Sequence, residues 1–351
     1  MTQRERIDAL AQTGTLTKED WISLIEGRAP EDERYAAEQA RQTAAARFGQ
    51  RVFIRGIVEF TNVCKNDCCY CGIRKSNACA ERYRMTEDEM LACCAGGYRL
   101  GFRTFVLQGG EDGYFTDERM CAVVRRIRAE YPDCAITLSL GERTRESYQR
   151  LYDAGANRYL LRHETANEAH YGRLHPPELS WKHRMDCLKD LRAIGYQTGC
   201  GMMIGSPYQT AETLAEDMLF MADFRPQMIG LGPFIPAAHT PFADQPAGTL
   251  KDTLFFLSLC RLMLPDVLLP ATTALGTIAP HGRALGILAG ANVVMPNLSP
   301  TANRGKYLLY DHKIGTTDEV SDGRAKLEEE LRAIGYTIRE GRGDYETRLK
   351  P

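Results

Sequence analysis

The chain has 351 residues, of which 44% are hydrophobic and 26% are charged, and its formal net charge at pH 7 is -2. This composition is typical of a folded globular protein, and the near-neutral charge argues against a nucleic-acid or anionic-membrane partner. No apolar run has the length of a membrane span, and the polar start MTQRERIDAL is unlike a secretion signal. We therefore expect a cytoplasmic protein.

The first 50 residues are predicted to form a helical extension. Thr17 is placed to cap a helix that begins KEDWISLIEG, and an alanine-rich amphipathic stretch follows to about Phe48. From residue 52 onward, short apolar runs alternate with helical patterns. The predicted strands are Val52–Phe60, Thr104–Gln108, Ala135–Leu140, Tyr159–Arg162, Gln197–Ile204, Met228–Pro233, Leu268–Thr273 and Asn292–Met295.

Helical patterns occupy the segments between these strands. They cover Glu87–Leu100, Asp117–Tyr131, Arg145–Ala154, Trp181–Ile194, Thr210–Phe224, Gly248–Met263 and His281–Ala289, and Asp322–Ile334 is a candidate closing helix. Strands that alternate with helices through short loops predict an α/β fold with a parallel sheet, and the number of strands favours a closed (β/α)8 barrel of the TIM type. We expect a helical extension over residues 1–50, the barrel over 51–310 and a closing segment over 311–351.

Three of the twelve cysteines lie close together after the first predicted strand. Cys64, Cys68 and Cys71 are spaced C-x3-C-x2-C, and Tyr70 precedes the last of them. A [4Fe-4S] cluster takes four thiolates, so this loop would leave one iron open for a small molecule. Zinc with a fourth ligand is an alternative, but structural zinc usually uses two separated C-x2-C pairs and the sequence has no second pair. Most of the other cysteines are expected to be small buried hydrophobes.

An open iron suits S-adenosylmethionine (SAM), whose amino and carboxylate groups can chelate it. A reduced cluster can then pass one electron into the sulfonium and release a 5′-deoxyadenosyl radical. Gly109-Gly110-Glu111 follows the second predicted strand. Its glycines let the backbone approach a ligand, and its carboxylate can accept a hydrogen bond from an ammonium group.

Other polar residues follow the predicted strands, where a barrel carries its chemistry. Alternation along the fourth strand points Arg162 and Glu164 inward together, where they either bind ligand groups or form a salt bridge that seals the barrel. His163 points the other way and is expected to be structural. Arg184 lies on the next helix, where the default expectation is a solvated face. Further candidates at strand ends are Ser139, Thr272 and Thr273.

The cysteine spacing and the Gly-Gly-Glu element resemble those of the radical SAM superfamily. Longer stretches resemble the [FeFe]-hydrogenase maturase HydE family from about residue 50 to residue 310. They are VEFTNVCKNDCCYCGIRKSN, RYRMT, LQGGED, TLSLGER, NRYLLRHETAN, GLGPFIP, PATTALGT and ANVVMPN.

This resemblance implies a complete barrel that carries one cluster on Cys64, Cys68 and Cys71, with SAM above it. The positions that match SAM contacts are Gly109, Gly110, Glu111, Ser139, Glu164 and Arg184. The positions that match the lower cavity are Arg162, Thr272, Thr273, Met295, Tyr307 and Tyr310. The implied substrate is a cysteine-bound iron carbonyl cyanide precursor of the diiron subcluster. The implied partners are the sister maturases HydG and HydF and a low-potential electron donor, such as a flavodoxin or ferredoxin.

Two departures from the family pattern are visible. No cysteine follows Cys260, so a second cluster near the C-terminus is not expected. After the fifth predicted strand, Tyr208 replaces a glycine, which should stiffen that loop and alter the cavity edge. Two alternatives stay open. One is a related barrel enzyme that acts on an amino-acid-like substrate, as methylornithine synthase does. The other is a non-catalytic iron–sulfur carrier, which would need a fourth protein ligand and no SAM pocket.

Overall fold

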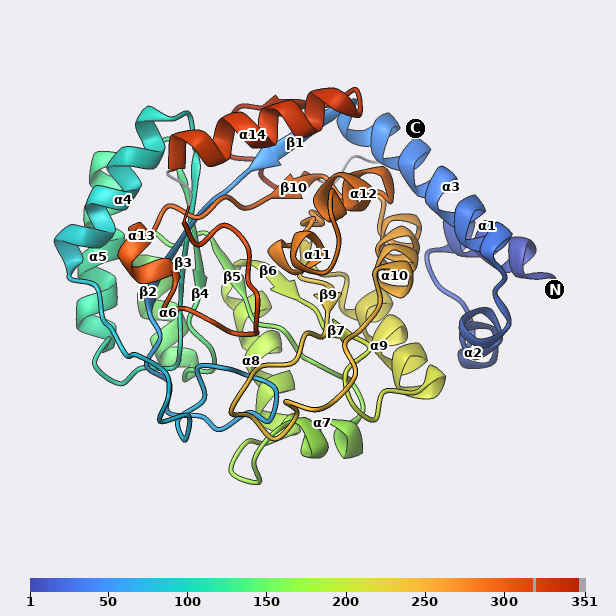
Figure 1. Ribbon diagram of the computed structural model, residues 1–351, viewed down its shortest axis with the longest axis horizontal. Coiled ribbons are helices and arrows are strands. Elements are labelled where there is room, and N and C mark those ends of the chain that lie inside the picture. Colours follow the sequence, from blue (N-terminus) through green and yellow to red (C-terminus); the bar gives the residue numbers. More distant parts are fainter. Residues whose placement is uncertain (318–319, 347–351) are drawn as a thin grey trace.

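The computed structural model describes residues 1–317 and 320–346. Three helices form the N-terminal extension at one side of the molecule (Figure 1): α1 (Gln3–Thr13), α2 (Lys18–Gly27) and α3 (Pro30–Phe48). As predicted, Thr17 caps α2, and its side chain accepts a hydrogen bond from the Asp20 N–H. Helix α3 packs against α10 (Leu250–Met263) through the buried Ala36, Ala40 and Ala44. Small side chains at this spacing let the two helices approach closely, so the extension is fixed to the barrel.

The barrel wall is a ring of parallel strands, which confirms the predicted TIM-type barrel. In chain order the strands are β1 (Arg51–Ile54), β2 (Gly56–Thr61), β3 (Thr104–Gly109), β4 (Ala135–Ser139), β5 (Arg158–Leu160), β6 (Gln197–Cys200), β7 (Met203–Ile204), β8 (Met228–Ile229), β9 (Gly232–Pro233), β10 (Val293–Val294) and β11 (Thr337–Arg339). One sheet has the order β2-β3-β4-β5-β6-β8. The ring closes through the bridges Met228–Leu268 and Pro270–Val293, the pairing of β10 with β1, and the bridge Ile57–Asn297.

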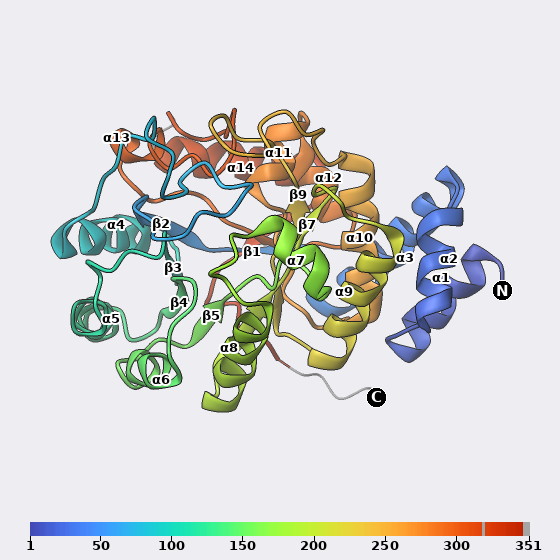
Figure 2. The ribbon, with the colours of Figure 1, turned by 90° about the horizontal axis from the view of Figure 1, so that it is seen from below.

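Helices cover the outside of this ring, as Figure 2 shows for α4, α5, α6 and α8. Besides α10 they are α4 (Glu87–Arg99), α5 (Asp117–Glu130), α6 (Arg145–Asp153), α7 (Glu168–Leu174), α8 (Trp181–Ile194), α9 (Ala211–Phe224), α11 (Thr273–Ile278), α12 (Gly282–Leu288), α13 (Thr301–Arg304) and α14 (Val320–Ala333). Helix α5, for example, buries an apolar stripe of Met120, Val123, Val124 and Ile127 against the ring. None of the helices in residues 1–317 and 320–346 combines the length and apolar character that a membrane crossing requires.

Several predicted strands are interrupted in the structure. The first is divided at Arg55 into β1 and β2, and the fifth is divided at Gly201 into β6 and β7. Gly201 has φ +150°, and a Cβ atom there would lie 2.1 Å from the Gly230 carbonyl oxygen, so the wall bends where two strands crowd each other. The seventh predicted strand makes only isolated bridges at Leu268 and Pro270. Its expected end at Thr273 is wrong, because Thr273 begins α11.

The last described residues close the floor of the barrel, at the N-terminal ends of the strands. Strand β11 pairs with β1, and the chain then crosses beneath β3 and β5. The carbonyl of Arg342 accepts hydrogen bonds from Thr104 Oγ1 and Arg158 Nη2, both at 2.8 Å. Asp344 pairs with the fully buried Arg158 at 2.8 Å. The division of the chain at residues 50 and 310 stays a prediction, but the segment after 310 is part of the barrel's closure.

Candidate functional site

The cysteine loop follows β2 at the C-terminal end of the barrel and is hydrogen-bonded to other segments of the chain. The Cys69 N–H donates to the Leu174 carbonyl at 2.9 Å, and the Gly72 N–H donates to the Leu309 carbonyl at 2.9 Å. In Figure 1 the loop (blue) and α7 lie at the same edge of the molecule. Arg82 donates to the carbonyls of residues 62, 73, 74 and 77. One guanidinium thus holds the loop's shape through backbone contacts alone, and the cysteine side chains are left for other partners.

The three predicted ligands share a low-polarity environment. Burial raises the pKa of all three thiols, to about 12 for Cys71 and well above the usual value for Cys68. The proximity of Cys71 and Cys64 raises the pKa of Cys68 further. A cluster site is suited by thiols that are neutral in the free protein, because such thiols lose their protons when the metal binds. The donor set therefore fits a group bound by Cys64, Cys68 and Cys71.

The Gly-Gly-Glu element after β3 packs directly against the cysteine loop. The Gly110 N–H donates to the Thr61 carbonyl at 3.1 Å, and the Lys65 N–H donates to the Glu111 carbonyl at 2.9 Å. A Cβ atom at Gly110 would lie 2.3 Å from the Val63 carbonyl oxygen, so this position requires glycine. The element therefore holds the backbone of β3 against the cysteine loop.

One oxygen of the Glu111 carboxylate accepts a backbone hydrogen bond, and the other faces only an exposed lysine. Its Oε1 accepts a hydrogen bond from the Glu142 N–H at 3.0 Å. Gly141 has φ +72°, and a Cβ atom there would lie 2.1 Å from Glu111 Oε1, so only glycine permits this approach. The buried Oε2 has no hydrogen-bond donor in the described residues, and the largely exposed Lys65 ammonium lies 3.1 Å away. This oxygen is available to a ligand ammonium.

Arg162 and Glu164 follow β5 and form the mutual salt bridge that the sequence left open, with Nη2 to Oε2 at 2.7 Å. Both nevertheless line the cavity described below. Glu164 has φ +65°, a left-handed conformation that costs a residue other than glycine about 1–3 kcal/mol and is typical of functional sites. Its N–H donates to the Gly201 carbonyl at 3.0 Å. As expected, His163 faces away, fully buried against Asp217 at 3.4 Å.

Arg184 is buried, so the default expectation of a solvated helix face is wrong. Its Nε lies 2.5 Å from Glu142 Oε1, and its Nη1 donates to the Arg162 carbonyl at 3.0 Å. Because the Glu142 N–H holds Glu111, Arg184 acts on the Gly-Gly-Glu element through Glu142. The sequence did not single out Glu142 as a site residue, although it follows a predicted strand.

A cavity of about 330 Å³ inside the barrel mouth brings most of the predicted residues together. Those that line it are Cys71, Gly109, Ser139, Arg162, Glu164, Arg184, Thr272, Thr273, Met295, Tyr307 and Tyr310. Cys64, Cys68, Gly110 and Glu111 lie in the adjoining loops and outside this lining. Tyr208 is also outside it, so the expected change at the cavity edge is not found.

Two polar atoms at the cavity lack protein partners. Arg162 Nε and Thr272 Oγ1 are buried, and neither has a hydrogen-bond partner in the described residues. Gly232 faces this hydroxyl, since a Cβ atom at that position would lie 2.9 Å from Thr272 Oγ1. Buried donors without acceptors are costly. A guanidinium and a hydroxyl in this state indicate that the cavity takes an anionic or strongly polar ligand.

One buried ion pair in the cavity wall was missed. Lys313 Nζ lies 2.5 Å from Glu59 Oε1 and donates to the Tyr307 carbonyl at 3.0 Å. Asn297 Nδ2 donates to Glu59 Oε2 at 2.7 Å. A carboxylate inside the apolar run IVEF is the signal that could have identified Glu59. Lys313 could not be assigned, because nothing in its neighbourhood of the sequence indicates that the chain returns to β2.

Comparisons with known proteins agree with this geometry. Residues 58–221 match the model of the radical SAM superfamily. The chain is 45% identical over 266 residues to the [FeFe] hydrogenase maturase subunit HydE of Thermotoga maritima, which covers 76% of each chain. It is 27% identical over 313 residues to the 3-methylornithine synthase of Methanosarcina barkeri, which covers 89% of this chain and 88% of that one.

Solved structures share the fold. The crystal structure of methylornithine synthase (PylB) matches with a TM-score of 0.81 and 25% identity, over 95% of this chain and 97% of that one. The maturase HydG matches with a TM-score of 0.79 and 19% identity, over 96% of this chain and 76% of that one. At 19% identity, the second likeness concerns the fold alone.

Proposed function

Because the chain belongs to the [FeFe]-hydrogenase maturase HydE family of radical SAM enzymes, we propose that it cleaves SAM at one [4Fe-4S] cluster held by Cys64, Cys68 and Cys71 and acts in [FeFe]-hydrogenase maturation. When bound, the cluster of this superfamily supplies the electron that splits a C–S bond of SAM into methionine and a 5′-deoxyadenosyl radical. The observation that carries the proposal is the single cavity that has Cys71 in its lining together with Arg162 and Thr272.

The groups around the Gly-Gly-Glu element suit the methionyl end of SAM. Glu111 Oε2 pairs only with the largely exposed Lys65, whose place a ligand ammonium can take, while Oε1 is fixed by the Glu142 N–H at 3.0 Å. Arg184 holds Glu142 from the other side at 2.5 Å. We assign Glu111 as a direct ligand of SAM and Arg184 as a positioning residue. Glu164, whose carboxylate also lines the cavity, suits the ribose hydroxyls.

The lower cavity suits a substrate with a carboxylate. Arg162 Nε and Thr272 Oγ1 lack partners, and Thr273 adds a second hydroxyl to the same lining. A cysteine-bound iron carbonyl cyanide complex carries such a carboxylate on its cysteine. In this proposal the protein binds that carboxylate and turns the cysteine sulfur toward the adenosyl radical. The sister maturases HydG and HydF would then supply the substrate or receive the product.

A related reaction on an amino acid is the second candidate. The match to methylornithine synthase spans nearly the whole of both chains, and an amino-acid carboxylate would satisfy Arg162 equally well. Membership of the radical SAM enzymes removes the third alternative, a non-catalytic carrier. The two remaining candidate functions therefore differ in the substrate that the enzyme converts.

The test is SAM cleavage by anaerobically reconstituted protein with dithionite as reductant. We expect 5′-deoxyadenosine to form, and to form faster with the cysteine–iron carbonyl cyanide complex than with free amino acids. Conversion of an amino acid in step with 5′-deoxyadenosine would favour the second candidate. A crystal soaked with the iron complex should place its carboxylate at Arg162.

The number of clusters is tested by iron analysis. No cysteine follows Cys260, so a second cluster near the C-terminus would lack thiolate ligands. We expect about four irons per reconstituted chain, the content of one [4Fe-4S] cluster. A content near eight would contradict the single-cluster proposal.

A further inference from the structure

The short helix α7 places an imidazole against the middle of the cysteine loop. His175 directly follows α7, and Pro176 restricts it to the extended conformation that it adopts, with φ -127° and ψ 155°. The side chain of His175 is buried, and its Nε2 lies 3.1 Å from the hydroxyl oxygen of Tyr70. Tyr70 directly precedes Cys71 in the sequence. A buried histidine to which the proposed function gives no role therefore contacts the residue next to a proposed cluster ligand.

The direction of this hydrogen bond follows from the other partner of the imidazole. His175 Nδ1 lies 3.0 Å from the Tyr171 carbonyl oxygen, which can only accept, so Nδ1 carries the hydrogen. Burial lowers the pKa of His175 to about 4, so the ring is neutral at pH 7 and its Nε2 is an acceptor. Burial also raises the pKa of the Tyr70 hydroxyl well above its usual value, so the hydroxyl keeps its proton. Tyr70 therefore donates its hydroxyl hydrogen to His175.

Aromatic contacts fix the orientation of both rings. The imidazole of His175 stacks on the Tyr171 ring, with ring centroids 3.9 Å apart and an interplanar angle of 22°. The same imidazole meets the Tyr70 ring edge-on, at 5.5 Å and 88°. Offset-stacked and edge-to-face pairs are the favoured arrangements of such rings. His175 is thus supported from one side by α7 and holds Tyr70 on the other.

The cysteine loop is seated at this point in a small apolar cluster that is separate from the main core. The cluster consists of Leu174, Met203, Phe234 and Phe242, and Cys69 and Tyr70 pack against it. The Cys69 N–H donates to the Leu174 carbonyl at 2.9 Å, and the Cys69 carbonyl accepts the Phe242 N–H at 3.3 Å. The backbone before Tyr70 is therefore fixed, and the hydrogen bond to His175 fixes the far end of its side chain.

We propose that His175 is a positioning residue, which holds the Tyr70 ring as a fixed wall of the cavity where SAM binds. Tyr70 lines the cavity together with Cys71, Glu164 and Arg184, whereas His175 lies outside this lining and acts through Tyr70. The inference rests on the proposed function, which places SAM beside Cys71. A wall that is ordered before the ligand arrives loses no conformational freedom on binding, so it raises the affinity for SAM.

The test measures equilibrium binding of SAM to the reconstituted protein. His175→Phe keeps a ring that can stack on Tyr171 but removes the acceptor, and Tyr70→Phe removes the donor. We expect each variant to bind SAM about tenfold more weakly, the effect of losing one hydrogen bond. Because both substitutions remove the same hydrogen bond, the double variant should bind no more weakly than either single variant. His175→Gln, which keeps an acceptor, should bind within about threefold of wild type.

The apoprotein gives a second measurement that requires neither the cluster nor SAM. With isotope-labelled tyrosine, NMR reports how fast the Tyr70 ring flips, and we expect flips about tenfold faster in His175→Phe than in the wild type. The matched control is Tyr196→Phe, which removes a buried hydroxyl that donates to the Tyr148 carbonyl at 2.8 Å, outside the cavity lining. The control should lower stability and leave both SAM affinity and Tyr70 motion unchanged.

The outcomes separate this inference from the proposed function. At saturating SAM with dithionite, His175→Phe should cleave SAM within about twofold of the wild-type rate, because only binding is affected. A wild-type protein that cleaves no SAM would contradict the proposed function, while the ring flips in the apoprotein still test His175. Unchanged ring flips in His175→Phe, or unchanged SAM affinity where the wild type binds SAM, overturn the inference. An equal loss of SAM affinity in Tyr196→Phe also overturns it, because the effect would then be structural.

Discussion

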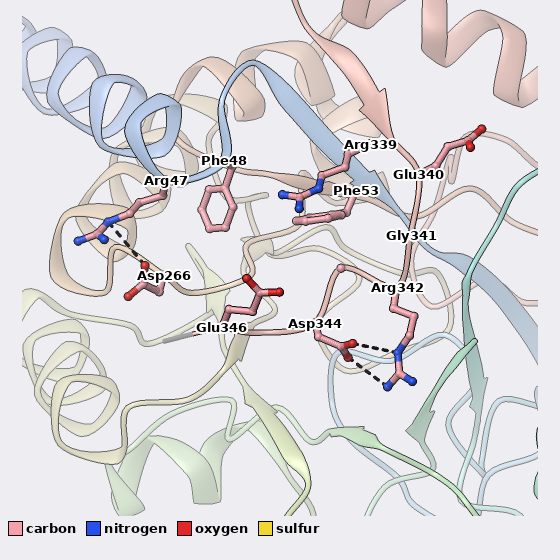
Figure 3. Close-up of a pocket in the computed structure, with 11 residues that line it drawn as sticks. Arg47, Phe48, Phe53, Asp266, Arg339, Glu340, Gly341, Arg342, Asp344 and Glu346 are labelled. Carbon is pink, nitrogen blue, oxygen red and sulfur yellow. Dashed lines mark hydrogen bonds and ion pairs between the residues drawn. The ribbon is translucent and has the colours of Figure 1, made fainter. Parts of the chain in front are cut away.

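The two ends of the barrel use the same kinds of charged residue in different ways. At the C-terminal end, Arg162 keeps a buried nitrogen without a hydrogen-bond partner in the described residues, and Glu164 adopts a left-handed conformation. At the floor, Asp344 pairs with Arg158 at 2.8 Å and with Arg342 at 2.9 Å. Figure 3 shows the floor pocket, where Asp344 and Arg342 point toward each other and Arg47 points toward Asp266.

The comparison teaches that neither charge nor a pocket as such marks the functional end, which is distinguished by a cavity whose lining combines Cys71 with the unpartnered atoms of Arg162 and Thr272. The floor pocket has a volume of about 210 Å³, and several of its charges pair with one another. It lies at the N-terminal ends of the strands, where barrels usually carry stabilising contacts. Arg158 and Arg342 also leave Nε without a hydrogen bond, but both guanidinium groups pair with Asp344. Arg55 is the exception at this end, because it is buried, pairs with no carboxylate of the described residues and donates only to Met228 Sδ at 3.0 Å. Substitutions at the two ends test this division of roles.

The largest effect is expected at the cysteine loop. Cys68→Ala should abolish cluster assembly and SAM cleavage, because two thiolates cannot hold the cluster. The neighbouring Cys69→Ala is the matched control and should keep both. Iron content and 5′-deoxyadenosine formation are the measurements. Full cleavage in Cys68→Ala, or its loss in Cys69→Ala, would contradict the ligand assignment.

At the floor, Asp344→Ala should lower stability without changing the chemistry. The substitution leaves the fully buried Arg158 without its carboxylate, which costs about 3 kcal/mol of unfolding free energy. Denaturant unfolding measures this loss, and SAM cleavage per folded molecule should stay at the wild-type level. The control is Asp186→Ala, which removes an exposed ion pair on α8 and should cost less than about 1 kcal/mol. Loss of cleavage with unchanged stability would show that the floor takes part in the reaction.

The unfolding free energy is expected to depend on pH through His175, which lies beside the cysteine loop. Burial lowers the pKa of His175 to about 4, and its Nε2 lies 3.1 Å from the Tyr70 hydroxyl. In the unfolded chain this histidine takes up a proton near pH 6.5, so stability present at higher pH is lost as the pH falls from about 6.5 toward 4. The loss amounts to about 2 kcal/mol at pH 5. His175→Gln should reduce this dependence in unfolding measured at pH 7 and pH 5. An unchanged pH dependence in the variant would refute the assignment.

Within the cavity, Thr272→Val together with Thr273→Val should impair the reaction of the substrate without impairing the binding of SAM. We expect SAM binding to be retained and turnover of the iron complex to fall about tenfold, because two hydroxyl groups that face the substrate are lost. Equilibrium binding of SAM and product formation measure the two effects. A collapse of SAM affinity would mean that the assignment of these residues to the substrate is wrong.

The smallest effect is expected from replacing Arg55, the buried arginine at the floor that has no carboxylate partner in the described residues. Arg55→Met should leave SAM cleavage unchanged and raise the unfolding free energy by about 1 kcal/mol, because a buried charge without a carboxylate partner is replaced by an apolar side chain of similar length. Thermal unfolding measures the change. A large loss of stability would show that Arg55 has a bound partner in solution.

Much of the barrel could be predicted because its strands and long helices have strong apolar periodicity. Helices α7 and α11 were missed because each has too few residues to show a period, and β11 was missed because its partner β1 lies near the other end of the chain. In the site, Cys71 and most of the predicted strand-end residues line one cavity, while their roles stay predictions. The burial of Arg184 and the pairing of Lys313 with Glu59 depend on tertiary contacts, which no local pattern records.

The pairings of Lys313 with Glu59 and of Asp344 with Arg158 have a consequence for folding. The paired residues are 254 and 186 positions apart in the chain. Contacts between segments so far apart form slowly, because the conformational entropy of a long loop is lost before the contact is made. We therefore expect the mouth and the base of the barrel to close late, after neighbouring strands have paired.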